Sequence, residues 1–236
     1  MSYPIYFDSG SVETGIVRVN TGVDSGIPGC KAAGRPRAAD MEARMRNLLE
    51  TAACLFLEKG YSKVSLEMIA REAHVAVRTI YVKFGGKAGL FNAVLAAGRS
   101  RYLNIGDMGT DMRPVEQILS DFGLRYLQLV SMPKIVGLHR MVIAEAHTNP
   151  ELAITYNQAG PGQTKELLSR FFARADIKID FRDDIPADAL AVHFLNCIKG
   201  DFLNRLLFGQ DEEPTDADLR HGVALGLNLF FNGTAR

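Results

Sequence analysis

The pattern of apolar and polar positions along the chain predicts a succession of α-helices. Between Asp40 and Lys59, apolar residues recur every three or four positions and form one stripe, and Gly60 follows as a stop signal. Residues 65–84, with the sequence SLEMIAREAHVAVRTIYVKF, predict two short amphipathic helices joined by a tight turn. Ser65 stands where the N-cap of the first of these helices is expected.

Helical signals continue through the second half of the chain, and no strand pattern interrupts them. We expect further helices at about 87–103, 114–132, 134–147, 150–173 with an interruption at Gly160-Pro161-Gly162, 187–208 and 216–231. Residues 1–30 have no helical period, and we interpret them as a disordered tail. The pattern as a whole predicts an all-α protein of about nine helices.

The two short helices within 65–84 have the layout of a helix-turn-helix. In the second helix Ile80 and Phe84 can point inward, while polar and basic side chains remain outside. In this motif the second helix lies in the major groove of DNA and the first crosses the backbone. Double-stranded DNA is therefore the expected partner.

The distribution of charge supports this interpretation. The formal net charge of the chain is zero, yet residues 31–106 hold 13 Lys and Arg against 6 Asp and Glu, a net charge of +7. The first 30 residues carry −2 and residues 107–236 carry −5. A basic segment joined to an acidic one is typical of a polyanion-binding part attached to a part with another task.

Composition and motifs exclude several other classes of protein. The chain has no apolar run of the ~18 residues that span a membrane and no secretory signal. Its three cysteines lie far apart, which is typical of reduced thiols (Cys30, Cys54 and Cys197). We therefore expect a cytoplasmic protein without membrane contact. No nucleophile elbow, P-loop, dinucleotide fingerprint or HExxH motif is present, so we expect neither an enzyme nor a cofactor.

The stretch at about 46–95, which includes LLETAACLFLEKGYSKVSLEMIAREAHVAVRTIYVKFGGKAGLFNAVL, resembles the TetR family of bacterial transcriptional regulators. It carries that family's ordered landmarks: Ala52, Phe56, Gly60-Tyr61, Leu66, Ile69, Ala70, Thr79, Ile80, Tyr81, Phe84, Lys87 and Leu90-Phe91. Farther along, MVIAEAHTNPELAITYNQAGP resembles the ligand domain of the AefR-like branch. The resemblance implies three parts: the tail at 1–30, a basic arm and DNA-binding domain at 31–86, and a helical effector-binding and dimerisation domain at 87–236.

The chain departs from the family pattern at several positions in the motif. His74 occupies the turn position where glycine is usual, and histidine tolerates the positive φ required there. Ala76 replaces the usual serine N-cap of the recognition helix, which should cost about 1 kcal/mol. Val77, Arg78 and Val82 differ from the commoner residues, so no operator sequence can be carried over from the family.

The expected DNA contacts are divided between bases and phosphates. Arg78 can reach a guanine edge with two hydrogen bonds, and the methyl groups of Val77 and Thr79 can meet thymine. Thr79 and Tyr81 match family positions at the DNA surface. The side chains that we expect on phosphates are Ser65, Tyr81, Lys83 and Lys87. The alternative is a solvated basic face with a buried tyrosine.

A short basic arm precedes the first helix. It contains Lys31 and the run Gly34-Arg35-Pro36-Arg37, a narrow and extended segment. An arginine on such an arm, Arg35 or Arg37, can enter the narrow minor groove, where the negative potential is enhanced. The alternative is a solvated linker that only adds positive charge.

In the second half, the resemblance implies a small-molecule effector site within the helical bundle. The candidate lining residues are Phe122, Tyr126, His139, Ile143, Tyr156, Phe171, His193 and Phe194. Plain core packing is the alternative for each of them. His193 and Cys197, at i and i+4, could share a metal ion, but two ligands on an apolar helix are weak evidence and we expect no metal.

These observations predict a homodimeric, ligand-responsive transcriptional repressor that binds a palindromic operator. The last two helices are expected to pair across a two-fold axis, and a glutamate at Gly226 is expected to disrupt that pairing. One alternative is a DNA-binding regulator without an effector, whose second domain only dimerises or binds a protein. An all-α enzyme with a basic face is another alternative, for which no catalytic constellation is visible.

Overall fold

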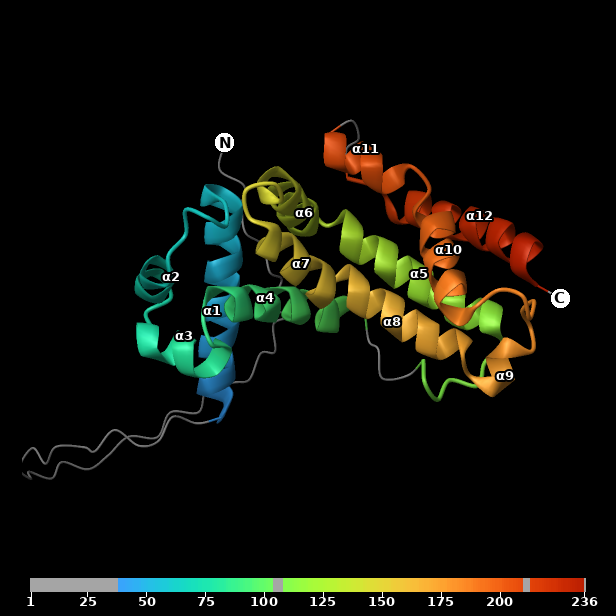
Figure 1. Ribbon diagram of the computed structural model, residues 1–236, viewed down its shortest axis with the longest axis horizontal. Helices are drawn as coiled ribbons and strands as arrows, with labels where there is room; N and C mark the ends of the chain where they lie inside the picture. The colour runs from blue at the N-terminus through green and yellow to red at the C-terminus, as the bar shows by residue number, and fades with distance from the viewer. Residues whose placement is uncertain (1–37, 104–107, 210–212, 236) are drawn as a thin grey trace, which may run out of the picture. The chain divides into compact units, whose positions relative to one another are not determined.

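A computed structural model describes residues 38–103, 108–209 and 213–235 of the chain (Figure 1). The predicted tail at 1–30 and the basic arm lie outside these residues. The described helices are α1 (Ala38–Lys59), α2 (Leu66–Glu72), α3 (Val77–Phe84), α4 (Lys87–Tyr102), α5 (Val115–Ser131), α6 (Pro133–Glu145), α7 (Pro150–Ala159), α8 (Pro161–Phe172), α9 (Ala175–Lys178), α10 (Ala187–Lys199), α11 (Phe202–Phe208) and α12 (Asp216–Thr234).

The all-α prediction is confirmed. The described residues contain no strand, and a single bridge joins Phe181 to Ala235. Several predicted helix ends are also confirmed. Gly60 ends α1 with φ +82°, and the Ser65 side chain accepts a hydrogen bond from the Met68 amide, 3.2 Å away. No helix among the described residues is long and apolar enough to cross a membrane.

The prediction of one helix over 187–208 is wrong. The chain turns at Gly200, which has φ +48° and separates α10 from α11. Glycine adopts such a conformation with little steric cost, so a helical sequence pattern can continue across a real break. After the break α11 runs against α6, where the Arg140 side chain donates hydrogen bonds to the carbonyls of Leu206 and Leu207.

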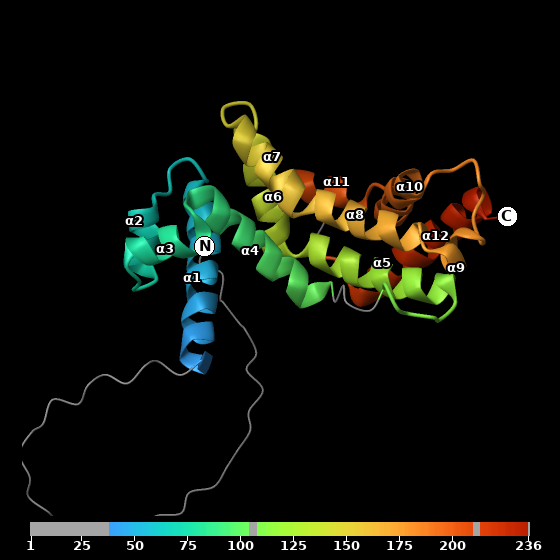
Figure 2. The same cartoon turned by 60° about the horizontal axis from the view of Figure 1, so that its bottom comes forward.

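Two hydrophobic cores hold the described helices together. The first lies among α1–α4 and is centred on the rings of Phe56, Tyr61 and Phe91, whose centroids are 5.3–5.5 Å apart. Leu138 and Leu152, from α6 and α7, also belong to this core. These two helices therefore attach the DNA-binding motif to the rest of the protein (Figure 2).

The second core lies among α5, α8, α10 and α12. It is rich in phenylalanine, and its rings contact one another edge to face or at a tilt: Phe122, Phe171, Phe172, Phe181, Phe194 and Phe230. Helix α10 packs against α8 on one side and α12 on the other. Aromatic pairs of this kind bury large areas and favour fixed geometry.

Candidate nucleic-acid interface and ligand-binding core

The turn between α2 and α3 is formed by His74. This residue has φ +53°, the only positive φ at a non-glycine position among the described residues, and the prediction of a positive φ is confirmed. Helix α3 then begins after Ala76, whose side chain makes no capping hydrogen bond. Ile80 is fully buried and fixes α3 on the first core. Local sequence signals therefore set the orientation of α3.

The outer face of α3 is largely exposed, apart from Val77, which also packs against the first core. Arg78 and Lys83 are exposed, and Thr79 and Val77 are half-buried. Tyr81 is 53% exposed, so the alternative of a buried tyrosine is wrong. Val82, which sequence analysis did not count among the contacts, is 75% exposed beside them. This face presents the guanidinium of Arg78, the ammonium of Lys83, the phenol of Tyr81 and the isopropyl group of Val82.

Two predicted phosphate contacts are engaged within the protein. The Ser65 oxygen caps α2, as described above, and a hydrogen bond from Ser65 adds to the backbone hydrogen bond that lowers the pKa of Glu67. The Lys87 ammonium lies 3.5 Å from the Ser62 carbonyl and 4.3 Å from the centre of the Tyr61 ring. Burial lowers the pKa of Lys87, while the charge of Glu145 opposes this. Arg35 and Arg37 lie outside the described residues.

Glu145, at the end of α6, links the second half of the chain to the helix-turn-helix. Its Oε2 atom accepts hydrogen bonds from the Ser62 amide, at 3.0 Å, and from the Ser62 hydroxyl. Burial raises the pKa of the neighbouring Tyr61, and the charges of Glu151 and Glu145 raise it further. Because Ser62 and Glu145 are 83 residues apart, no local sequence signal predicts this contact.

Arg99 makes a second link of this kind. Its Nη1 atom donates a hydrogen bond to the carbonyl of Ala159, which joins α4 to the end of α7. Its Nε atom is buried without a hydrogen-bond partner. Helix α4 also packs directly against α3. Helix α4 thus contacts both α3 and the end of α7.

Three of the predicted effector-site residues come together at one end of the second core. The rings of Phe122 and Tyr126 stack with centroids 6.2 Å apart, and Phe194 lies 6.1 Å from Phe122. Phe171 is buried in the same core. Burial, with a smaller effect from Tyr156, raises the pKa of Tyr126 to about 12.

His139 of α6 and Tyr156 of α7 connect this group to the first core, since Tyr156 acts on Tyr126 and packs against the first core. Their ring centroids are 5.4 Å apart. Burial raises the pKa of Tyr156 to about 12 and lowers that of His139, which the positive charge of Lys199 lowers further. Sequence analysis missed Lys199, because a lysine at a helix end is usually exposed. The two other predicted residues, Ile143 and His193, are exposed.

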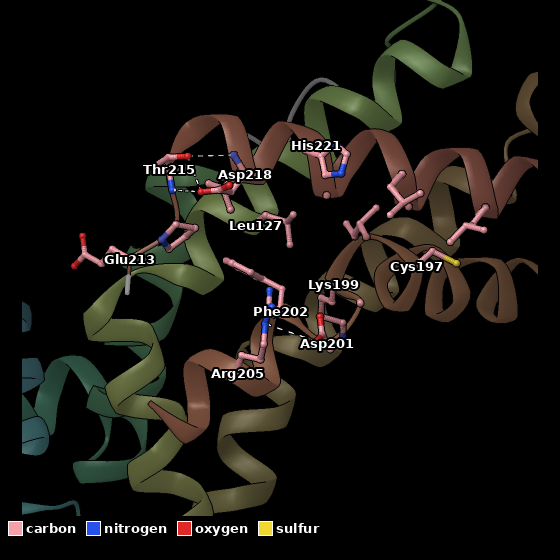
Figure 3. A pocket seen from close by; sticks show the side chains of 18 residues that line it. Leu127, Cys197, Lys199, Asp201, Phe202, Arg205, Glu213, Thr215, Asp218 and His221 are labelled. Carbon is pink, nitrogen blue, oxygen red and sulfur yellow. Dashed lines mark hydrogen bonds and ion pairs between the residues drawn. The ribbon is translucent and has the colours of Figure 1, made fainter. Parts of the chain in front are cut away.

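An open cavity of about 630 Å³ is lined mainly by residues of α10, α11 and α12, and Lys199 belongs to its lining as well (Figure 3). Its charged rim includes Lys199, Arg205 and Asp218, and Asp218 closes a reciprocal cap with Thr215 at the start of α12. Its apolar part includes Leu225 and Leu229, which are 55% and 59% exposed. Two large apolar side chains are thus left uncovered on this face.

Gly226 does not lie where its predicted role requires. A Cβ atom at this position would come within 2.6 Å of the Cys197 carbonyl oxygen and the Ile198 Cα atom. The small residue therefore permits close contact between α12 and α10 of the same chain. The expectation that Gly226 meets a partner subunit is corrected accordingly, since a glutamate there would separate two helices of one core.

His193 and Cys197 do not gather further metal-ligating groups around them. Within the three described segments, no cluster of three or more His, Cys, Asp or Glu side chains could hold a metal ion. The candidate chemistry of the protein thus consists of the exposed face of α3 and the polar side chains at the edge of the second core.

Comparison with protein families gives two matches that together cover most of the described chain. Residues 48–94 match the bacterial regulatory proteins of the tetR family, and residues 117–233 match the C-terminal domain of AefR-like transcriptional repressors. Comparison with curated protein sequences gave no match.

Several solved structures have the same fold. The flavonoid-responsive regulator FrrA has a TM-score of 0.66 and 25% identity, over 82% of this chain and 98% of that one. NalD of Pseudomonas aeruginosa, the secondary repressor of the MexAB-OprM multidrug efflux pump, has a TM-score of 0.56 and 25% identity, over 84% and 98%. A TetR transcriptional regulator from Agrobacterium tumefaciens has a TM-score of 0.63 and 21% identity, over 81% and 94%.

The matches to both halves agree with the geometry of the helix-turn-helix and of the helical bundle behind it. The chain belongs to the TetR family of DNA-binding transcriptional regulators.

Proposed function

We propose that the protein is a homodimeric repressor that binds a palindromic operator and is released from it by a small-molecule effector. The observation that carries this proposal is the outer face of α3. One side of this helix is anchored by the buried Ile80, while Arg78, Tyr81 and Lys83 stay exposed on the other. A rigid helix with a free basic and aromatic face suits the major groove.

The roles of these side chains follow from their chemistry. Arg78 is the candidate for reading a guanine, because its guanidinium can donate two parallel hydrogen bonds to O6 and N7. Val82 and Val77 offer methyl groups to thymine. Tyr81 and Lys83 are assigned to phosphates, which set affinity and register. Lys87 is assigned to the loop between α1 and α2, where its ammonium contacts the Ser62 carbonyl and the Tyr61 ring. To reach DNA, the ammonium would have to leave the Tyr61 ring.

Homodimerisation is proposed through α10 and α12. Leu225 and Leu229 leave apolar surface exposed on α12, next to the open cavity. A two-fold axis through this face would make the interface self-complementary. It would also place two recognition helices about one turn of DNA apart, roughly 34 Å, so that the operator must be a palindrome.

The proposed effector acts through the links between the two cores. A ligand shifts an equilibrium only by its difference in affinity for the two arrangements. The Ser62–Glu145 and Arg99–Ala159 hydrogen bonds are the contacts through which such a difference can reach α3. A hundredfold loss of operator affinity requires a coupling of roughly 2.7 kcal/mol. The similarity to a flavonoid-responsive regulator supports a small-molecule response.

Selection of bound sequences from a random pool of duplex DNA tests this function. The purified full-length protein at near-physiological salt should enrich a palindrome with half-sites about one helical turn apart. Enrichment of no sequence, with binding that disappears steeply as salt rises, would indicate electrostatic affinity alone and would contradict the proposal.

A further inference from the structure

Four polar side chains from four helices converge where the second core, which includes Tyr126, meets the first core, against which Tyr156 packs, and they leave their polar atoms unused. They are Tyr126 of α5, His139 of α6, Tyr156 of α7 and Lys199 of α10. Within the described residues, none of these side chains has a hydrogen-bond or ion-pair partner, whereas the other half-buried cations of the molecule, Lys87, Arg99 and Arg174, do. We propose that this Tyr–His–Tyr–Lys cluster is a binding site for a small organic anion, a carboxylate or phenolate with an apolar body.

The inference rests on the proposed ligand response and specifies the chemical class of the ligand. The contacts of the cluster are set by packing. His139 and Tyr156 have ring centroids 5.4 Å apart, and Tyr126 stacks on Phe122 at 6.2 Å. Arg140, next to His139, holds α11 against α6 through the carbonyls of Leu206 and Leu207. Lys199, at the end of α10, lies close enough to His139 for its charge to lower the pKa of that imidazole.

The four side chains are shielded while their polar atoms stay accessible, since Arg99 Nε is the one buried side-chain nitrogen or oxygen without a hydrogen-bond partner among the described residues. Tyr126 is 8% exposed, and Tyr156, His139 and Lys199 are half-buried. Buried polar groups in folded proteins are almost always hydrogen-bonded. A buried charge that lacks a partner is costly. Here the polar atoms of four shielded side chains have no partner and remain accessible at one place, so a single ligand can meet all of them.

The charges at the cluster favour an anion over a cation or a neutral molecule. Burial and the charge of Lys199 lower the pKa of His139, so its imidazole is neutral at pH 7. The raised pKa values of Tyr126 and Tyr156 keep both phenols protonated as hydrogen-bond donors. Lys199 is then the one positive charge in the cluster, and no described carboxylate pairs with it. An incoming anion would supply the missing charge and accept hydrogen bonds from the phenols.

The apolar part of the ligand follows from the neighbouring walls. Phe122 and Phe194 lie directly behind Tyr126, with centroids 6.1 Å apart. Ligand sites in proteins combine mainly apolar walls with a few convergent polar groups. Inorganic phosphate or a highly hydrated dianion would not use these walls, so an aromatic or aliphatic monoanion fits better.

Matched acids and amides test the proposal. Benzoate, cinnamate, 2-naphthoate and decanoate are each compared with the neutral carboxamide, by calorimetry and thermal shift of the full-length protein at pH 7. At least one acid should bind ten or more times more tightly than its amide. Lys199→Met should remove this preference and leave the affinity for the amide within twofold, while Lys199→Arg should retain it. Lys178→Met, at an exposed lysine of α9, is the control and should change nothing.

Two further readouts separate a ligand site from a structural role. Lys199→Met should keep or raise the melting temperature of the free protein, because it removes an unpaired, partly buried charge. Tyr126→Phe should weaken the acid without unfolding the protein. Three results would each overturn the proposal: amides that bind as tightly as their acids, a preference for acids that survives Lys199→Met, or a panel in which no acid binds.

Operator binding measured with the same compounds distinguishes this inference from the proposed function. An acid that binds through Lys199 but leaves operator affinity unchanged would support the anion site and contradict the ligand response. A neutral compound that releases the operator, in a panel where no acid binds, would support the response and overturn the anion site.

Discussion

At the scale of single residues, Arg78 and Lys83 on α3 are assigned different tasks in DNA binding. Arg78→Ala should reduce discrimination at one base pair by about 1–3 kcal/mol, because a guanine then loses its two hydrogen bonds. Lys83→Ala should weaken binding about equally on all sequences. It should also reduce the slope of log affinity against log salt concentration by about one, the effect of one phosphate contact. Fluorescence anisotropy on a selected operator and its single-base variants measures both effects.

The control for this pair of variants is Arg170→Ala, which removes an exposed arginine of α8 far along the chain from α3. It should leave affinity and discrimination unchanged. The assignment of Arg78 fails if its alanine variant retains full discrimination at every position of the operator.

Residue-level signals in the sequence were strong where their causes are local. The cap at Ser65, the positive φ of His74 and the stop at Gly60 depend on neighbours within a few positions, and the structure confirms all three. The cluster at Tyr126 was only partly predicted. Its aromatic members follow helical spacing, but Lys199 reaches it only after the chain folds back at Gly200.

At the scale of elements, α3 begins without a capping side chain. Ala76→Ser should raise the free energy of unfolding by about 1 kcal/mol, because a serine oxygen can accept a hydrogen bond from the first turn of α3. Chemical denaturation measures the change. Ala97→Ser, at an exposed interior position of α4, is the matched control and should lower stability by up to ~0.5 kcal/mol. A destabilising Ala76→Ser would mean that the start of α3 differs from the one described.

The Ser62–Glu145 contact allows a test of the link between α6 and the DNA-binding motif. A double-mutant cycle with Ser62→Ala and Glu145→Gln should give a coupling energy of about 0.5–1.5 kcal/mol, because alanine removes the hydrogen bond from the Ser62 hydroxyl to the carboxylate and keeps the one from the backbone amide. Pairing Ser62→Ala with Glu151→Gln, at a nearby exposed carboxylate, should be additive. If the cycle through Glu145 is also additive, this contact does not couple α6 to the helix-turn-helix.

Helix positions were predictable from the sequence to a greater extent than helix breaks. Apolar periodicity fixes where α1, α5 and α12 run, since each buries one continuous face. The break at Gly200 was missed because the apolar pattern continues across it into α11. Gly226 was assigned to a partner helix because a small residue marks close approach but does not say which helix approaches.

At the scale of the whole molecule, the proposed dimer depends on the exposed apolar side chains of α12. Leu225→Glu and Leu229→Glu should shift the protein from dimer to monomer, because each places a charge at the centre of the proposed interface. Sedimentation velocity measures the mass. Ile179→Glu, at an exposed apolar position that follows α9, is the control and should leave the mass unchanged. A dimeric mass for both leucine variants would assign dimerisation to another surface.

In the proposed dimer, two recognition helices held at a fixed separation read a palindrome together. The most direct test is the affinity of the full-length protein for its selected palindrome before and after about five base pairs are inserted between the half-sites. The insertion turns one half-site to the opposite side of the duplex, so affinity should fall at least about a hundredfold, towards that for non-specific DNA. Equal affinity for both duplexes would show that the half-sites are bound independently and would contradict the account.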